Sequence, residues 1–243
     1  MILNRAAAII PVRYDSRRFP GKALAPILGK PMIQWVYEGV KQARLVDKVI
    51  IATDDRRIQE EAQGFGAAAV MTSKDHGSGT ERAAEIAQDV DNKIIINIQG
   101  DEPLISGRHV DSLIETLEDG NIPTASLMTR VNDTASIDDP NMVKVAVDIN
   151  GYALYFSRSP LPYRAADFFY LHIGIYGFQR DFLLRFPGLR PSRLERTEKL
   201  EQLRILENGF RIRMIEVPHP ALSVDTPRDI IRVEEVLRKR NHA

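Results

Sequence analysis

The sequence predicts an α/β fold: a single domain with a mixed, mainly parallel central sheet flanked by helices, plus a small antiparallel elaboration. In the first half, short and almost wholly apolar runs alternate with amphipathic segments. This alternation is typical of parallel strands that are buried on both faces and linked by crossover helices. In the second half the strand-like runs are less regular, and Asn150-Gly151 between two of them is a strong hairpin signal. Some antiparallel pairing is therefore expected there.

Four strands and three helices are expected in the first half of the chain. Pro31 can occupy the first turn of a helix that runs to about residue 44, because its fixed φ suits that position. Asp54 or Asp55 can cap a helix that runs to about residue 65, and a third helix begins near Thr80. The strands are expected at residues 6–12, 48–53, 67–71 and 93–98.

The second half is expected to hold five more strands and two helices. A charged amphipathic helix covers residues 192–207 and is ended by Asn208-Gly209. A terminal helix covers 226–239, with Pro227 in its first turn. The strands are expected at residues 123–131, 143–148, 152–156, 170–178 and 211–217. No repeat or Gly/Ser-rich linker divides the chain, so residues 1–243 are interpreted as one domain.

The composition excludes several classes of function. The 33 basic residues balance the 33 acidic ones, so no overall field favours nucleic acid or an anionic membrane. The absence of cysteine excludes disulfides, thiol nucleophiles and cysteine-based metal sites. No run approaches the roughly 18 apolar residues of a membrane helix, and the run at 6–12 is too short for a signal-peptide core. We expect a soluble cytoplasmic protein with small-molecule partners.

A basic loop follows the first expected strand and is the first candidate binding site. It carries Arg13, Arg17, Arg18 and Lys22, together with Ser16 and a glycine. Ligands of open α/β sheets bind beyond the carboxyl ends of the strands, where such a loop suits a polyphosphate. The spacing matches neither a Walker loop nor a dinucleotide fingerprint. A solvated basic loop with no ligand is the alternative interpretation.

Two aspartates are candidate metal ligands. Asp101 follows the strand expected at 93–98, within Gly100-Asp101-Glu102-Pro103, and Asp225 lies just before the terminal helix. A carboxylate is a hard oxygen ligand that suits Mg²⁺. An ordinary turn at Asp101 and a plain helix cap at Asp225 are the alternatives. The sequence alone leaves open whether the two aspartates meet.

Other polar residues give weaker signals. Gln99 precedes Gly100 and Arg82 lies near a helix start. Arg158 ends a strand, and strand alternation places His172 and Tyr176 on one face. Glu201 and Gln202 lie on a helical face of the kind that is usually solvated.

Read together and in order, these segments resemble the CMP-Kdo synthetases, the 3-deoxy-manno-octulosonate cytidylyltransferases. CMP-sialic acid synthetases share the opening theme and the fold, but not this set of motifs. The matching blocks cover residues 10 to 229 and read IPVRYDSRRFPGKAL, ATDD, VMTSKDHGSGTER, INIQGDEPLI, DPNMVKV, GYALYFSRSPLP, HIGIYGF, ERTEKLEQLRILENG and SVDTPRD.

The resemblance implies a fold of the nucleotide-diphospho-sugar transferase type, which is Rossmann-like. It implies transfer of CMP from CTP to 3-deoxy-D-manno-octulosonate (Kdo), giving CMP-Kdo and pyrophosphate for lipopolysaccharide core synthesis. It also implies a requirement for Mg²⁺ and a homodimer. Residues 1–120 would form the nucleotide-binding half and 121–243 the sugar-binding and dimerisation half. An 8-amino analogue of Kdo is the alternative acceptor.

The resemblance also assigns roles to individual residues. Arg13 and Lys22 would hold the triphosphate, with Ser16 and Arg17 beside them. Arg82 and Gln99 would lie in the nucleotide pocket, and Asp101 and Asp225 would hold Mg²⁺. The catalytic set would be Asp101, Asp225, Lys22 and Arg13. The sugar site would be lined by Arg158, His172, Tyr176, Glu201 and Gln202.

Two other classes of protein are alternatives to a cytidylyltransferase. A non-catalytic sensor of CTP or sugar is disfavoured, because Lys22 and both carboxylates are present. A nicotinamide-dependent dehydrogenase would fit the α/β pattern but lacks the glycine fingerprint.

Overall fold

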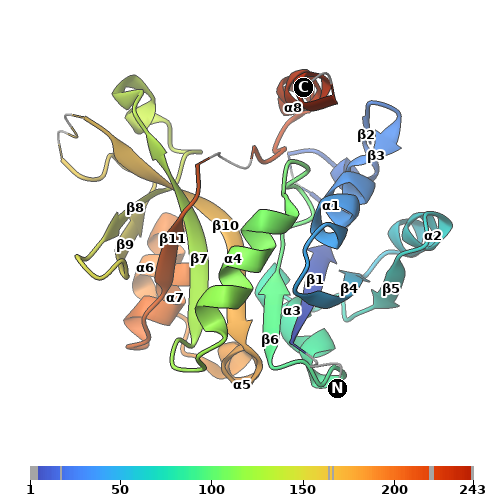
Figure 1. The fold of residues 1–243 in the computed structure, drawn as a ribbon, viewed down its shortest axis with the longest axis horizontal. Helices are drawn as coiled ribbons and strands as arrows, with labels where there is room; N and C mark the ends of the chain where they lie inside the picture. Colours follow the sequence, from blue (N-terminus) through green and yellow to red (C-terminus); the bar gives the residue numbers. More distant parts are fainter. Residues whose placement is uncertain (1–4, 17, 164, 166, 219–221, 242–243) are drawn as a thin grey trace.

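The fold is built on a sheet of nine strands, within the residues that this computed structural model describes: 5–16, 18–163, 165, 167–218 and 222–241. Seven strands follow one another in the order β11-β7-β10-β6-β1-β4-β5, and β8 and β9 extend the sheet from β10 (Figure 1). They span Ala6–Val12 (β1), Val46–Thr53 (β4), Ala68–Met71 (β5), Ile94–Asn97 (β6), Thr124–Val131 (β7), Lys144–Val147 (β8), Ala153–Ser157 (β9), Phe169–Gln179 (β10) and Arg213–Glu216 (β11).

The sheet is mixed and mainly parallel, which confirms the predicted fold class. β6, β1, β4 and β5 pair in parallel, and β11 pairs in parallel with β7. β10 runs antiparallel to both β6 and β7. The small antiparallel elaboration is the β8–β9 hairpin, whose turn has Gly151 at a φ of 74°. A separate two-stranded sheet joins β2 (Pro26–Ile27) to β3 (Lys30–Pro31).

Helices cover both faces of the sheet. Successive residues of β1 point to opposite faces, so Ala8 and Ile10 join one apolar cluster while Ala7 and Ile9 join the other. α1, α2 and α4 pack on the first face, and α3, α5 and α7 pack on the second. The helices span Met32–Lys41 (α1), Arg56–Gly64 (α2), Gly79–Gln88 (α3), Gly107–Leu117 (α4), Arg180–Arg185 (α5), Arg193–Glu198 (α6), Gln202–Glu207 (α7) and Pro227–Asn241 (α8).

Local capping explains where the early helices begin. The Asp55 carboxylate accepts a hydrogen bond from the backbone N–H of Arg57, 2.9 Å away, which confirms the predicted cap of α2. Ser78 caps α3 in the same way through the backbone N–H of Glu81. Pro31 stands at the N-cap of α1 rather than inside its first turn, and α1 ends at Lys41, short of residue 44.

The predicted single helix at 192–207 is wrong, because the segment forms two short helices. α6 ends at Glu198, the next residue Lys199 adopts a left-handed conformation with φ 55°, and α7 begins at Gln202. The carboxylate of Glu198 accepts hydrogen bonds from Ser157 Oγ and the backbone N–H of Arg158 on β9 and the residue after it. Tertiary contacts therefore determine the break between α6 and α7, which no glycine or proline in this segment indicates.

The sequence analysis also missed α4 and α5. One face of α4 is buried, yet that face includes the polar residues His109 and Asp111. Asp111 accepts hydrogen bonds from the backbone N–H groups of Arg44 and Leu45, 3.0 Å away in each case. A buried aspartate that caps a distant chain segment obscures the apolar periodicity of its own helix.

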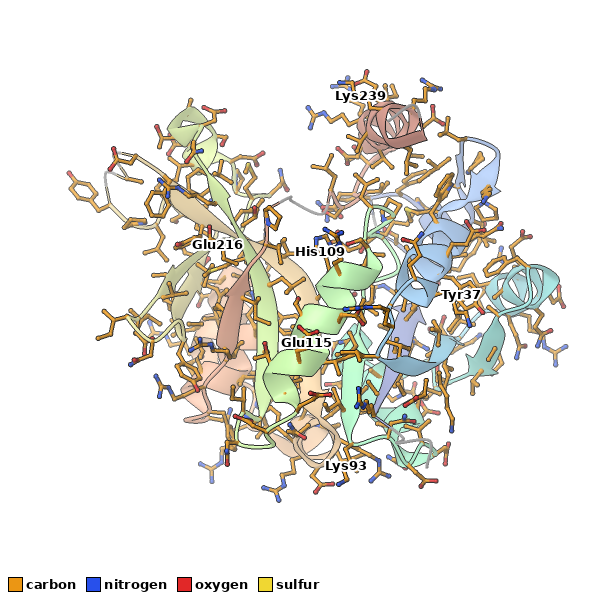
Figure 2. All side chains as sticks on the ribbon, in the orientation of Figure 1. Tyr37, Lys93, His109, Glu115, Glu216 and Lys239 are labelled. Atoms are coloured by element: carbon orange, nitrogen blue, oxygen red, sulfur yellow. The ribbon has the colours of Figure 1, made fainter. Side chains whose placement is uncertain are left out.

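The terminal helix α8 lies apart from the main layers, beside β2 and β3 (Figure 1). Val233 and Leu237 on α8 pack against Ile27 and Met32 in a third apolar cluster. Lys239 lies on α8, at the upper edge of the molecule in Figure 2. Among the residues that the structure describes, no helix combines the length and apolar character needed to cross a membrane.

Candidate active site

A cavity of about 340 Å³ opens at the carboxyl edge of the parallel strands. Its walls come from the loop after β1, the turn after β6 and the segment that leads into α8. The edge is shared because β1 pairs with β4 and β6 in parallel, so their last residues lie side by side. The lining residues are Pro11, Val12, Arg13, Ser16, Arg18, Lys22, Ala23, Met32, Gln99, Gly100, Asp101 and Asp225.

Lys22 joins the two aspartates that the sequence singled out. Its Nζ contacts a carboxylate oxygen of Asp101 and lies 3.7 Å from Oδ1 of Asp225. It also donates to the carbonyl oxygen of Val224 at 3.1 Å. Arg18 adds a second cation, with Nη2 2.7 Å from Oδ1 of Asp225. The structure thus brings Asp101 and Asp225 together around one ammonium group.

The basic loop is held in a closed turn. The carbonyl oxygen of Tyr14 accepts hydrogen bonds from the backbone N–H groups of Ser16 and Gly21, at 3.1 and 2.9 Å. Gly21 has a φ of 71°, which suits glycine, and a Cβ there would lie 3.1 Å from the Tyr14 ring. The guanidinium of Arg57 covers the Tyr14 ring at 3.3 Å from its centroid. This turn carries Ser16 and Lys22 to the cavity.

The carboxyl groups in and beside this cavity favour the binding of positive charge. Glu102 is buried, and its Oε2 has no hydrogen-bond partner among the residues that the structure describes. Burial raises the pKa of Glu102 well above its usual value, and the negative charges of Asp101 and Asp225 raise it further. Lys22 is the cation that opposes this effect.

The cavity fits a divalent cation of the kind that binds oxygen. One ammonium reaches both Asp101 and Asp225, so a single metal ion can also lie between two hard oxygen ligands. No group of three or more histidine, cysteine or acidic residues forms a metal cage in the described part of the chain. Mg²⁺ suits such a sparse site, because it commonly uses one or two carboxylates and takes its other ligands from water and phosphate.

A second polar cluster lies on β10 and at the start of α7. Glu201 accepts a hydrogen bond from the hydroxyl of Thr80, and Thr80 in turn accepts one from Asn97 Nδ2 at 3.1 Å. Tyr176 pairs with Asn97 across the sheet, and its ring lies 5.5 Å from that of His172. The structure therefore brings Glu201, Tyr176 and His172 together, and Gln202 is buried in the first turn of α7.

Burial shifts the titration of this cluster toward its neutral forms. It lowers the pKa of His172 to about 3, because the ring packs against Phe156 and Tyr176. It raises the pKa of Glu201, although hydrogen bonds from Ser78 and Thr80 partly offset the effect. It also raises the pKa of Tyr176, with a further contribution from Glu201. Within the described part of the chain, two buried oxygens, Oε2 of Glu201 and Oδ1 of Asn97, lack a hydrogen-bond partner.

Backbone carbonyls hold the guanidinium of Arg158. Its Nε donates to the carbonyl oxygen of Glu198 at 2.9 Å, and its Nη1 donates to that of Pro140 at 2.8 Å. The buried Lys144 donates to the carbonyl oxygens of Asp139 and Arg158, at 2.9 and 2.6 Å. No ion pair engages the guanidinium among the described residues, so its charge remains for an anion.

A further cavity, of about 410 Å³, adjoins Glu201 on the side of α3 and α6. Ser78 and Glu81 line it from the start of α3, and Lys199 and Arg204 line it from the α6–α7 region. Arg204 is bound to Glu195 at 2.6 Å and lies 3.4 Å from Glu81. Glu201 thus belongs both to this cavity and to the cluster around Tyr176.

The remaining predicted site residues differ in position. Gln99 lines the first cavity, close to Gly79. Arg82 is buried and does not line either cavity; its Nη2 lies 2.7 Å from the Asp54 carboxylate. Arg17 lies outside the described residues.

The sequence analysis assigned no role to several residues of the site. Arg18 was visible only as one of four cations in its loop, and Glu102 only as part of the turn that holds Asp101. Thr80 was noted only as a helix start. No sequence pattern indicates the contact between Ser126 and His172.

Comparisons with known proteins show to which family the chain belongs. Residues 7–214 match the model of the cytidylyltransferase family. A 3-deoxy-manno-octulosonate cytidylyltransferase of Syntrophotalea carbinolica is 49% identical over 244 residues, covering 95% of this chain and 98% of the relative. One of Geobacter sulfurreducens is 48% identical over 246 residues, covering 95% and 98%.

Solved structures extend the comparison to the fold. A CMP:2-keto-3-deoxy-manno-octonic acid synthetase complexed with CTP matches with a TM-score of 0.92 and 42% identity, covering 97% of this chain and 99% of that chain. A 4-diphosphocytidyl-2C-methyl-D-erythritol synthase of Anaerococcus prevotii shares the fold alone, with a TM-score of 0.63 and 12% identity, covering 96% and 98%. With nearly half of its residues identical over almost the whole length, the chain belongs to the 3-deoxy-manno-octulosonate cytidylyltransferases, within the cytidylyltransferase family.

Proposed function

We propose that this protein transfers CMP from CTP to the anomeric hydroxyl of Kdo, giving CMP-Kdo and pyrophosphate. The observation that carries the proposal is the cavity in which Lys22 and Arg18 meet Asp101 and Asp225, in a chain that belongs to this family. A triphosphate and a sugar hydroxyl need such a mixture of cations and carboxylates.

The proposed reaction is a single in-line displacement. The anomeric oxygen forms a bond to the α-phosphorus, and the bond from that phosphorus to the bridging oxygen of the β-phosphate breaks. The bonding electrons leave with pyrophosphate, and the proton of the hydroxyl is released. Such transfers need positioning and charge neutralisation more than covalent chemistry. Arg13, Arg18 and Lys22 would bind the triphosphate and stabilise charge on the departing pyrophosphate.

We further propose that Asp101 and Asp225 hold Mg²⁺. When bound, the ion would neutralise phosphate charge and lower the pKa of the attacking hydroxyl. Lys22 would then exchange its carboxylate contacts for phosphate oxygens. The short reach from Lys22 Nζ to both carboxylates supports this exchange.

The sugar acid would lie between the two polar clusters. Arg158 would bind its carboxylate, since a guanidinium fork matches a planar anion and this guanidinium is free of ion pairs among the described residues. His172, Tyr176, Glu201 and Gln202 would contact its hydroxyl groups. The buried Oε2 of Glu201 and the buried Oδ1 of Asn97 nearby have no hydrogen-bond partner among the described residues, which supports a polar ligand at this place.

The test is pyrophosphate release with CTP and three acceptors: Kdo, 8-amino-Kdo and a sialic acid. We expect the highest kcat/KM with Kdo, and the loss of turnover after complete chelation of divalent ions. A preference for 8-amino-Kdo would change the acceptor but keep the reaction class. Undiminished turnover without divalent ions would remove the role of Mg²⁺.

We also infer a homodimer formed through the second half of the chain. Large apolar side chains are exposed there on and beside the β8–β9 hairpin, with Ile149 fully exposed and Leu154 62% exposed. An exposed edge strand with apolar side chains favours pairing with a second copy. Light scattering at micromolar concentration should give twice the mass of the chain, and a monomer would contradict the inference.

The biological setting is inferred from the same reaction. CMP-Kdo is the activated donor for the lipopolysaccharide core, so we propose this role for the product. The cytoplasmic location stays a prediction, which cell fractionation with an antibody against the protein tests. Recovery in a membrane or periplasmic fraction would contradict it.

A further inference from the structure

We propose that Ser126 fixes the tautomer of His172, so that Nε2 carries the proton and Nδ1 accepts a hydrogen bond from a hydroxyl of the sugar acid. Ser126 lies on β7, is fully buried and is a positioning residue in this account. The role of Nδ1 rests on the proposed function, whereas the tautomer does not.

The argument begins with the hydrogen bonds of one hydroxyl group. Ser126 Oγ lies 2.9 Å from His172 Nε2, 2.9 Å from the carbonyl oxygen of Ile175 and 3.2 Å from that of Ile173. A serine hydroxyl has one proton to donate and two lone pairs to accept with. The carbonyl oxygens can only accept, so both of them compete for the single proton of Ser126.

The number of available protons then indicates which nitrogen of the His172 imidazole is protonated. If His172 Nε2 were an acceptor, it would need the only proton of Ser126. Both carbonyl oxygens would then face the lone pairs of Ser126 Oγ inside a fully buried site, which is costly. If Nε2–H donates instead, the hydroxyl donates its proton to the carbonyl oxygen of Ile175 or Ile173, so only one carbonyl oxygen faces a lone pair of Ser126 instead of two. The neutral ring then leaves Nδ1 as an acceptor.

A bulge in β10 creates this arrangement. β7 and β10 pair regularly up to Ile173 opposite Leu127, but the next pair is Tyr176 opposite Ser126. Two residues of β10 therefore lie outside the regular ladder, and the carbonyl oxygens of Ile173 and Ile175 turn toward Ser126. Bulges of this kind often re-aim side chains beside active sites. Here the bulge puts His172 and Tyr176 in ring contact, 5.5 Å apart.

The surroundings keep the ring neutral. Its neighbours are the rings of Phe156, at 4.9 Å, and Tyr176. Burial holds the pKa of His172 near 3, so a charged imidazolium is not available to bind the sugar carboxylate at neutral pH. His172 is thereby suited to reading a hydroxyl, and the carboxylate is left to a permanently charged group such as Arg158.

The tautomer is measured directly by NMR on the full-length protein with ¹⁵N-labelled histidine rings. The His172 signals are identified by their absence from the His172→Gln variant. At pH 7 we expect a protonated Nε2 and an unprotonated Nδ1. A His172 that is protonated on Nδ1, or on both nitrogens, would overturn the proposal.

Two variants and a matched control test the role of Ser126. Ser126→Ala should release the tautomer and raise KM for Kdo by about 10- to 100-fold, with KM for CTP unchanged. Ser126→Thr keeps the hydroxyl and should restore both properties. Thr124 is the control, because it is also buried on β7 and donates to a β10 carbonyl, that of Gly177 at 2.9 Å. Thr124→Val should leave the tautomer and KM for Kdo unchanged.

The outcomes separate this proposal from the proposed function. An unchanged tautomer in Ser126→Ala, or an equal rise of KM for Kdo in Thr124→Val, would overturn the role of Ser126. If the wild-type protein does not use Kdo, the proposed function fails and the assignment of Nδ1 to the sugar fails with it. The tautomer of the ligand-free protein still decides what Ser126 does.

Discussion

At the scale of single residues, Lys22 explains how the parts of the candidate active site are assembled. Its ammonium lies between Asp101 and Asp225, which reach the cavity from opposite halves of the chain. Sequence patterns identified each carboxylate from its place after a strand or before a helix. They could not identify Ser126, because its importance comes from a bulge in a neighbouring strand.

The carboxylates should be essential for turnover but not for folding. Asp101→Asn and Asp225→Asn should each lower kcat by several powers of ten, because metal-borne stabilisation of the transition state is worth several kcal/mol. Steady-state kinetics and circular dichroism check both expectations. Asp55→Asn, at the N-cap of α2, is the matched control and should keep wild-type kcat. A near-normal kcat in either cavity variant would show that its carboxylate is not a metal ligand.

Arg158 should discriminate between the two substrates. Arg158→Lys keeps the charge but loses the planar fork, so KM for Kdo should rise by about 10-fold or more while KM for CTP stays within about twofold. Initial-rate measurements with each substrate varied in turn give both constants. An equal rise in both constants would place Arg158 outside the sugar site.

His172 should make folding stability depend on pH. Its pKa is about 3 in the folded protein and near 6.5 when unfolded, so between these values the unfolded chain binds more protons. Stability is therefore lost as the pH falls, and from pH 7 to pH 5 this residue should account for about 2 kcal/mol. Urea unfolding at both pH values should show a loss smaller by this amount in His172→Gln. Equal losses in the two proteins would contradict the shifted pKa.

At the scale of elements, the sequence predicted the bounds of the buried strands well, but it did not predict a helix break that depends on tertiary contacts. β1 was predicted with the observed bounds, and β4, β5 and β6 within two residues, because near-continuous apolar runs leave few alternatives. The break between α6 and α7 depends on hydrogen bonds from Glu198 to β9. That break turns Glu201 toward Thr80, and Gln202 beside it is buried, although a helical face of this kind is usually solvated.

The left-handed residue at this break gives a stability prediction. Lys199 has φ 55°, a conformation that costs an L-residue roughly 1–2 kcal/mol but costs glycine little. Lys199→Gly should therefore raise the free energy of unfolding, by up to about 1 kcal/mol after the extra chain entropy of glycine is subtracted. Lys41→Gly, in the last turn of α1, should lower it by about 1 kcal/mol. Urea unfolding of both variants is the measurement, and equal destabilisation would contradict the assigned conformation.

At the scale of the whole molecule, one sheet connects the two candidate binding regions. β6 carries the turn with Asp101 and pairs with β10, which carries His172 and Tyr176. The nucleotide and the sugar acid can thus be placed on neighbouring strands of one rigid sheet. The order of the chain gave no direct sign of this proximity, because β10 inserts antiparallel between β6 and β7.

The most direct test of the central claim is ³¹P NMR of the protein with CTP, Kdo and Mg²⁺. We expect the CTP signals to be replaced by those of one phosphodiester and one pyrophosphate in equal amounts, only when Kdo is present. Asp101→Asn should abolish the change under the same conditions. Release of inorganic phosphate with CDP, or consumption of CTP that does not depend on Kdo, would contradict the account.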